Sequence, residues 1–289
     1  MEIRRADRPY VPEVEGLRGE HFDEVVVGYE RALPHRMTFG VRGVARSVRE
    51  AIGVGFYRYF IEPPDFGNPG RGELSWLPPY TRDYRALELT LERSAAGKLG
   101  FLVSYVYSRN HGNYGGLYAA DQRWAAPQNY FSLQLEDQAI NSTGLLPNDR
   151  THALKLVSTW AATEDLSIGA FFSAMSGTPL NELGATWFVY RPMFLVERGS
   201  AGRTPTLWDL NLRVTYNLQR LFRAASAPEV RLIADLQHVG SPRKAVDYDQ
   251  QRFWSVDGDG SQGTPNLGFG QTIAYQEPMS LRLGLQISF

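Results

Sequence analysis

The sequence predicts an all-β fold, a segment of a transmembrane antiparallel β-barrel with about nine meandering strands. Three observations lead to this prediction. Apolar and polar residues alternate in many stretches, short and long connections follow one another, and the chain closes on an alternating strand whose last residue is Phe289. Because successive side chains of a strand point to opposite faces, this alternation places one face in an apolar medium and the other in a polar one.

Composition excludes several other classes of protein. A net charge of −1 gives no basic footprint for nucleic acid, and the absence of cysteine excludes disulfides and thiolate metal sites. No apolar run has the length of a membrane helix, and the first residues, MEIRRADRPYVPEVEG, lack the apolar core of a signal peptide. Aromatic residues form 12% of the chain, which suits a barrel with aromatic girdles at the membrane interfaces.

The expected strands are each about as long as a tilted strand needs to be to cross a bilayer. Alternation is clear in ALELTLER, KLGFLVSYVYS, LWDLNLRVTYN, VRLIADLQ and PMSLRLGLQISF, and weaker in VVVGYER, MTFGVR, HALKLVSTW and LSIGAFFS. The predicted strands lie at residues 23–32, 36–48, 83–94, 98–108, 150–162, 165–175, 205–218, 229–239 and 278–289.

The connections between these strands differ in length in a regular way. Short ones lie around 34–35, 95–98 and 163–165, with a medium one near 219–228. Long connections rich in Gly, Pro, Asn, Asp and aromatic residues alternate with them. Short periplasmic turns and long extracellular loops are typical of outer-membrane barrels, whereas a soluble sandwich rarely carries such loops. The long connections run roughly over 57–82, 109–149, 178–203 and 240–277.

An odd number of strands does not suit a complete bacterial barrel, which has an even number in one chain. An open sheet would also leave two unpaired strand edges in hydrocarbon, where each unmet backbone group costs several kcal/mol. We therefore expect residues 23–289 to be the C-terminal portion of a larger outer-membrane barrel, with residues 1–22 a remnant of an extracellular loop.

Four stretches resemble the TonB-dependent outer-membrane receptors, and are most similar to the long-looped branch with a carboxypeptidase-regulatory-like domain. EVVVGYERAL resembles a strand that ends in Glu-Arg before a short turn, and LPNDRTHALKLVSTW resembles the Asp-Arg-x-His start of another. FFSAMSGTPL resembles the exit of the following strand, and NLGFGQTIAYQEPMSLRLGLQISF resembles the closing segment. Together the four stretches span residues 25 to 289, nearly the whole chain.

The resemblance implies a barrel of roughly 22 strands with a plug in its lumen. It also implies energy coupling through a TonB box and import of a scarce ligand. This sequence lacks the signal peptide, the TonB box and the plug, so coupling to TonB would require an N-terminal part that is missing here. Siderophore, cobalamin, glycan and peptide all remain open as ligands.

The terminal strand is expected to close the barrel and to carry a signal for the barrel-assembly machinery. In outer-membrane proteins, a C-terminal aromatic residue after alternating apolar residues resembles the signal that this machinery reads. Strand addition supplies the physical reason, because an exposed edge pairs through its backbone while alternate side chains give specificity. The alternative is an ordinary lipid-facing strand. The apolar positions are Met279, Leu281, Leu283, Leu285, Ile287 and Phe289.

Nine charged residues fall on the polar side of the predicted strands. Since a charge facing lipid is costly, we expect them to line a wet lumen, where they hold a plug or guide a ligand. The alternative for any one of them is simple pairing across neighbouring strands. The lumen-facing candidates are Arg42, Glu88, Glu92, Lys155, Asp209, Arg213, Arg231, Asp235 and Arg282.

Aromatic residues in the long loops are candidates for a ligand-catching surface, with girdle or loop packing as the alternative. The main candidates are the tryptophans Trp76, Trp124, Trp187 and Trp254. Tyrosines extend the set: Tyr80, Tyr114, Tyr118, Tyr130, Tyr190 and Tyr248.

No cofactor, metal site or catalytic motif is expected. VDGDGS, with Asp257 and Asp259, departs from the EF-hand template, because Gln262 and Gly268 occupy positions that need Gly and Glu. The sequence contains no GxSxG, HExxH or P-loop motif.

Two alternatives to a receptor stay open at this point. One is an outer-membrane barrel enzyme such as a surface hydrolase, which needs Asp, His or Ser side chains clustered at one rim. His152, His238 and Asp209 are the residues to test for it. The other is a soluble β-sandwich that binds glycans, which would remain a monomer without detergent.

Overall fold

The computed structural model consists almost entirely of strands and loops. No helix in the described part of the chain is long and apolar enough to cross a membrane. The structure describes residues 14–56, 65–94, 97–116, 118–119, 124–125, 133–185, 192–218, 229–256 and 263–288.

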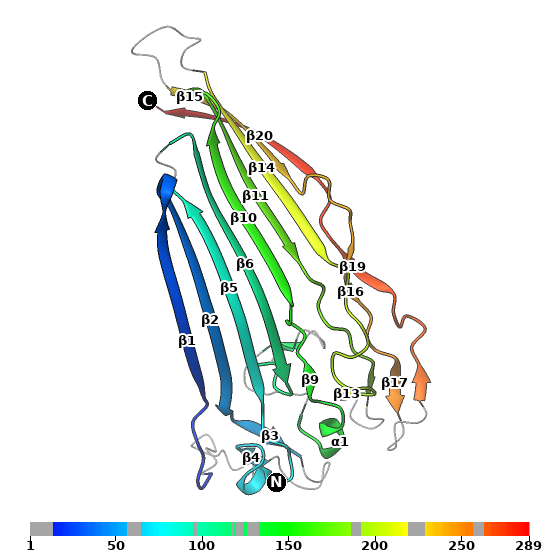
Figure 1. Cartoon of the computed structure of the whole chain (residues 1–289). Coiled ribbons are helices and arrows are strands. Elements are labelled where there is room, and N and C mark those ends of the chain that lie inside the picture. The colour runs from blue at the N-terminus through cyan, green and yellow to red at the C-terminus, as the bar shows by residue number, and fades with distance from the viewer. Residues whose placement is uncertain are drawn as a thin grey trace, which may run out of the picture.

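All nine predicted strands are present, and they form one antiparallel sheet in which each strand pairs with the next long strand of the chain. Figure 1 shows them running side by side from blue to red. Their ends differ from the predicted ones by four residues or fewer. The strands are β1 (His21–Leu33), β2 (Met37–Glu50), β5 (Arg82–Arg93), β6 (Leu99–Gly112), β10 (His152–Ala161), β11 (Leu166–Met175), β14 (Leu207–Asn217), β15 (Glu229–Gln237) and β20 (Ser280–Ser288).

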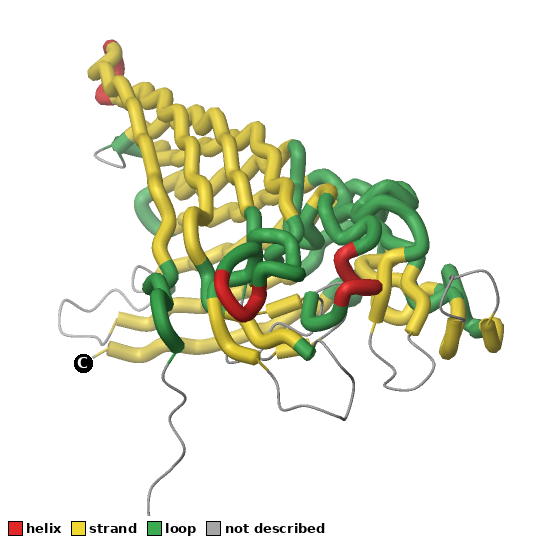
Figure 2. The backbone as a smooth tube through the Cα atoms, turned by 90° about the horizontal axis from the view of Figure 1, so that it is seen from below, coloured by secondary structure: helices red, strands yellow, loops and turns green. Residues whose placement is uncertain are grey.

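The sheet is curved but not closed. Its strand order begins with β1 and ends with β20, so each of these two strands has a long neighbour on one side only in the described structure. Figure 2 shows the curved sheet from below. The predicted segment of a barrel is therefore confirmed as an open antiparallel sheet.

Connections of different length lie at opposite ends of the sheet, as predicted. The short 3₁₀ turn η1 (Pro34–Arg36) joins β1 to β2 at the end where β20 also finishes (Figure 1). At the other end the long connections contain small elements of their own. These are β3 (Gly53–Gly55), β4 (Asp65–Gly67), η2 (Gly72–Leu74), β7 (Tyr118–Ala119), β8 (Trp124–Ala125), α1 (Glu136–Ala139), β9 (Gly144–Leu145), β12 (Leu183–Ala185), β13 (Pro192–Phe194), β16 (Ala245–Tyr248), β17 (Phe253–Val256), β18 (Gly263–Pro265) and β19 (Thr272–Tyr275).

The long connections pack together into what we call the loop cap, the described parts of residues 51–81, 113–151, 176–206 and 238–279. Backbone hydrogen bonds join its four segments, from Phe56 to Gln134, from Leu145 to Arg198 and from Leu183 to Gln250. All fourteen buried hydrophobic side chains of the described residues lie here, outside the nine long strands. The packed core of this chain is therefore in its loops.

Strand register gives the sheet two chemically different faces. Directly opposed residues of antiparallel strands share a face. Arg42 opposes Glu88, Arg213 opposes Asp235, and Asp235 in turn opposes Arg282. Following this register across the sheet puts all nine predicted inward charges on one face, the polar face. The other, the apolar face, carries the alternating Leu, Val, Ile and aromatic residues.

Candidate functional site

Most charges of the polar face have partners within the sheet. Arg42 forms an ion pair with Glu88, and Arg213 with Asp235 at 2.5 Å. A similar ion pair joins Glu24 to Arg46, which lie directly opposite each other on β1 and β2. Neither residue was among the candidates predicted from sequence. In these three pairs, an arginine on one strand is neutralised by a carboxylate on the neighbouring strand.

The other inward candidates have different surroundings. Arg231 contacts Glu229 at 2.7 Å, and Asp209 accepts a hydrogen bond from Asn211 at 2.7 Å. In the described part of the chain, Glu92 and Lys155 take part in no ion pair. Their role in a lumen stays a prediction.

The terminal strand has the predicted alternation. Leu281, Leu283, Leu285 and Ile287 of β20 lie on the apolar face and are about half exposed or more, while Met279 directly precedes the strand. Phe289 lies outside the described residues. The role of this strand as an assembly signal stays a prediction.

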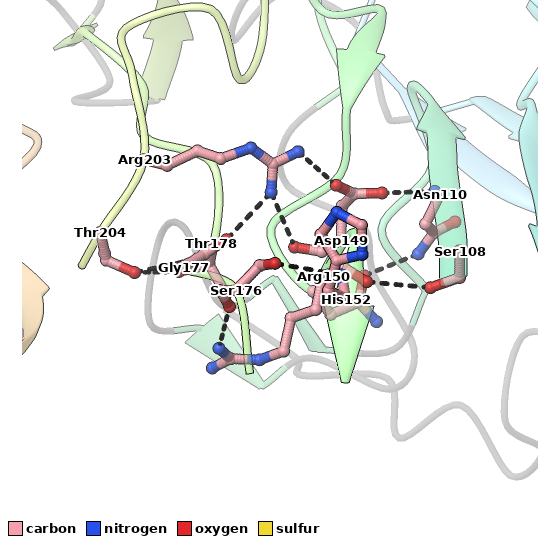
Figure 3. A network of polar contacts seen from close by, with 11 residues as sticks. Ser108, Asn110, Asp149, Arg150, His152, Ser176, Gly177, Thr178, Arg203 and Thr204 are labelled. Atoms are coloured by element: carbon pink, nitrogen blue, oxygen red, sulfur yellow. Dashed lines mark hydrogen bonds and ion pairs between the residues drawn. The ribbon is translucent and has the colours of Figure 1, made fainter. Parts of the chain in front are cut away.

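Where the sheet meets the loop cap, a polar network brings two of the four motif stretches together (Figure 3). The Asp149 carboxylate is 1% exposed, accepts a hydrogen bond from the backbone N–H of Asn110 at 2.6 Å and pairs with Arg203 at 2.5 Å. Arg203 also donates to the Gly177 carbonyl at 2.9 Å. The start of β10 is thus fastened to the segment that follows β11 and to the loop before β14.

The second half of the network joins β10 to the end of β11. The Ser176 hydroxyl accepts a hydrogen bond from the His152 amide at 3.0 Å, and Arg150 donates to the Ser176 carbonyl at 2.6 Å (Figure 3). Burial lowers the pKa of the Arg150 guanidinium below its ordinary value. An arginine nevertheless remains protonated at physiological pH, so Arg150 binds the Ser176 carbonyl through a charged donor.

The glycine of the SGTP stretch is required by close packing. A Cβ atom at Gly177 would lie 1.6 Å from the Thr204 carbonyl oxygen, which no side chain tolerates. Next to it, Thr178 and Thr204 exchange hydrogen bonds of 2.9 Å. The likeness of this stretch to a known motif therefore has a structural cause, the close approach of two loop segments at the rim.

Among the loop aromatics, two tyrosines pack in the core of the loop cap. Tyr80 and Tyr114 are buried and stacked with ring centroids 4.9 Å apart, and the Tyr80 hydroxyl donates to the Leu133 carbonyl. Trp76 is half-buried, and Trp254 is 53% exposed. The side chains of Tyr118 and Trp124 lie outside the described structure, as do Tyr130, Trp187, Tyr190, Asp257 and Asp259.

A cavity of about 430 Å³ lies where the polar face meets the loop cap, and sequence reasoning did not find it. Its walls include Phe22, Arg46 and Tyr84 from the strands and Tyr114 from the cap, and Arg46 stacks on the Phe22 ring. Asn110 also lines it; this side chain is 4% exposed, and its Oδ1 is buried without a hydrogen-bond partner among the described residues. A buried acceptor without a partner is costly.

The three residues named for the enzyme alternative do not come together. His238 lies 2.9 Å from Asp209 on the polar face. His152 directly opposes Tyr107 on the apolar face, and its ring contacts Tyr105 and Tyr107. Within the described ranges no three His, Asp or Glu side chains group so as to hold a metal ion.

Comparison with known proteins agrees with this fold. No family model matches the chain. The TonB-dependent transporter Oar of Myxococcus xanthus is 27% identical, over 94% of this chain and 28% of its own length. The chain therefore spans little more than a quarter of this relative.

Solved structures show the fold at low sequence identity. The outer membrane transporter YddB of Escherichia coli has a TM-score of 0.60 and 10% identity, over 96% of this chain and 34% of its own. The ferric-catecholate import receptor Fiu of Escherichia coli has a TM-score of 0.51 and 11% identity, over 94% and 28%. The comparisons confirm the predicted resemblance: this chain is similar over 94% of its length to part of a TonB-dependent transporter, and it has the fold of part of an outer-membrane β-barrel.

Proposed function

We propose that this chain, as part of a larger barrel, serves an outer-membrane receptor that captures a scarce ligand at its long-loop end. The ligand then passes along the polar face, whose charges, including the nine predicted ones, line the lumen. Residues 23–289 supply the barrel wall in this proposal, and residues 1–22 belong to an extracellular loop. The similarity to a TonB-dependent transporter supports the proposal.

The observation that carries the proposal is the cavity between the polar face and the loop cap. It lies at the end where a ligand from outside would arrive, and it combines aromatic walls with a guanidinium and the Asn110 side chain. Apolar walls with a few convergent polar groups are typical of small-molecule sites.

The proposed partners follow from the two faces and the edge strand. Lipid covers the apolar face, and the barrel-assembly machinery reads β20, whose free edge is available for strand addition. Energy coupling to TonB takes place through a part of the receptor that this chain does not include. Nucleic acid is not a partner, since the net charge is −1.

We also propose that the chain has no catalytic role. Its relatives are transporters and receptors. Asp209 and His238 form a pair, but His152 lies on the other face of the sheet, so the three do not form a catalytic cluster.

Uptake by intact cells tests the proposal. The gene segment that encodes this chain is deleted in its host, and radiolabelled ferric siderophores, cobalamin, oligosaccharides and oligopeptides are supplied one class at a time. We expect uptake of one class to be lost and to return with the wild-type gene. Restoration by Asn110→Leu is expected to be poor, whereas Leu267→Ala, an exposed loop position outside the cavity, restores uptake fully.

Unchanged uptake of every probe after the deletion would contradict the receptor proposal. Cell fractionation provides a second readout, because a barrel portion stays in the outer-membrane fraction and needs detergent. A soluble monomer without detergent would instead contradict a place in the outer membrane.

A further inference from the structure

Two arginines face each other on the apolar face, at the loop-cap end of the sheet. Arg85 of β5 directly opposes Arg109 of β6, and both side chains are exposed. Two residues further along these strands on the same face, toward the loop cap, Asp83 opposes His111. The four side chains line a shallow hollow of about 310 Å³.

Neither arginine has a carboxylate partner in the described part of the chain. The nearby Asp83 carboxylate accepts a hydrogen bond from the Ser47 hydroxyl at 2.5 Å. Like charges directly opposite each other on neighbouring strands are destabilising, in contrast to the paired charges of the polar face. The arginine pair therefore lacks the counter-charge that other arginines of this sheet have.

The neighbouring side chains indicate the depth of this pair in the membrane. One step toward the middle of the sheet, Leu87 opposes Tyr107, and Tyr107 opposes His152. The Tyr105 hydroxyl lies 2.7 Å from His152 Nδ1, and the Tyr107 and His152 ring centroids are 5.4 Å apart. Aromatic groups of this kind lie at the headgroup level of a bilayer.

Arg109 follows Tyr107 by two residues on the same face, which is about 7 Å along a strand. The guanidinium pair consequently lies just beyond the aromatic group, outside the hydrocarbon, where arginine is well tolerated. This is the level at which membrane lipids carry their phosphate groups.

We propose that Arg85 and Arg109 bind the phosphate of a lipid headgroup in the extracellular leaflet. Guanidinium groups match phosphate oxygens with paired, charge-assisted hydrogen bonds. One phosphate between the two arginines removes their mutual repulsion. The acyl chains of the same lipid lie against Leu87 and Tyr107, which are nearer the middle of the sheet. The inference requires the apolar face to meet lipid and does not depend on which ligand the receptor takes up.

Binding of a phosphorylated glycolipid tests the site. The full chain is held in a neutral detergent, and purified lipid A, its dephosphorylated form and inorganic phosphate are titrated separately, with bound lipid counted by native mass spectrometry. We expect lipid A to bind and the dephosphorylated form to bind about tenfold more weakly or worse, as expected for loss of hydrogen bonds to charged groups. Binding should weaken as salt is raised.

Variants assign the binding to these two residues. The double variant Arg85→Gln/Arg109→Gln should lose about tenfold or more in affinity, and Arg85→Lys/Arg109→Lys should retain part of it because the charge remains without the planar fork. Arg31→Gln/Arg93→Gln removes two arginines from the same face at the short-turn end and should leave affinity unchanged. Unchanged far-ultraviolet circular dichroism shows that each variant folds.

Equal affinity of the Arg85→Gln/Arg109→Gln variant and the wild type would overturn the proposal. Displacement of lipid A by inorganic phosphate at equal concentration would also overturn it, because the site would then bind free phosphate.

Discussion

The nine-stranded sheet and the loop cap differ in whether they bury hydrophobic side chains. In the described sheet no hydrophobic side chain is buried, and Leu283 of β20 is 68% exposed. In the loop cap Leu74, Leu133 and Leu146 are fully buried. The sheet therefore needs lipid on one face and further protein or water on the other, whereas the cap carries a core of its own. Long loops are the packed part of this chain, and regular strands are its unpacked part.

The largest expected effect is on the rim of the cap. Gly177→Val places side-chain atoms on the Thr204 carbonyl oxygen and should cost about 3 kcal/mol or more in the free energy of unfolding of the cap. Limited proteolysis in detergent measures this as faster cleavage of the loops. Gly19→Ala is the control, since nothing lies within 4 Å of that position. Equal cleavage rates in both variants would show that the rim is not closely packed.

Removal of the buried carboxylate is expected to have the next largest effect. Asp149→Ala removes the carboxylate that pairs with Arg203 and accepts from the backbone N–H of Asn110, and should destabilise the cap by about 3 kcal/mol. Urea unfolding in detergent micelles, followed by loop tryptophan fluorescence, measures the change. The matched control Glu73→Ala alters an exposed acid in the same cap and should change stability by less than about 0.5 kcal/mol. A similar loss in both variants would contradict the role of the network.

A pair of leucine truncations compares the two regions directly. Leu74→Ala empties a fully buried site in the cap and should cost about 3 kcal/mol, whereas Leu283→Ala on β20 should cost under about 1 kcal/mol in detergent. Both changes are measured by the same urea titration. If Leu283→Ala proved as costly as Leu74→Ala, the sheet would have a packed core that its exposure does not indicate.

The smallest effect is expected on the polar face. Arg42→Gln breaks the exposed ion pair with Glu88 and should change stability by about 0.5 kcal/mol, less at high salt. A double-mutant cycle with Glu88→Gln isolates the pair. A coupling energy that stays unchanged at high salt would mean that the pair is shielded from solvent.

The strand pattern could be predicted from sequence because its cause is local. Every second residue of a strand meets the same medium, so a run such as LWDLNLRVTYN reports both the strand and its two faces. The same reasoning placed all nine inward charges on one face, as the register confirms. It did not give their partners, because pairing such as Glu24 with Arg46 depends on the register between strands.

The loop cap could not be predicted for the opposite reason. Its contacts join residues far apart in the chain, such as Asn110 with Asp149 and Asp149 with Arg203. Loop sequences carry no period that reports burial, and Tyr80 and Trp254 cannot be told apart by pattern. The structure buries Tyr80 and leaves Trp254 half exposed.

The sequence by itself determined that this protein is a sheet with one apolar and one polar face, joined by short turns at one end and long loops at the other. Only the tertiary structure decided that the long loops form the core, that Asn110 lines a cavity, and that Arg85 meets Arg109. Alternation is a property of neighbouring residues along one strand, whereas a cavity or an arginine pair depends on how distant segments are brought together.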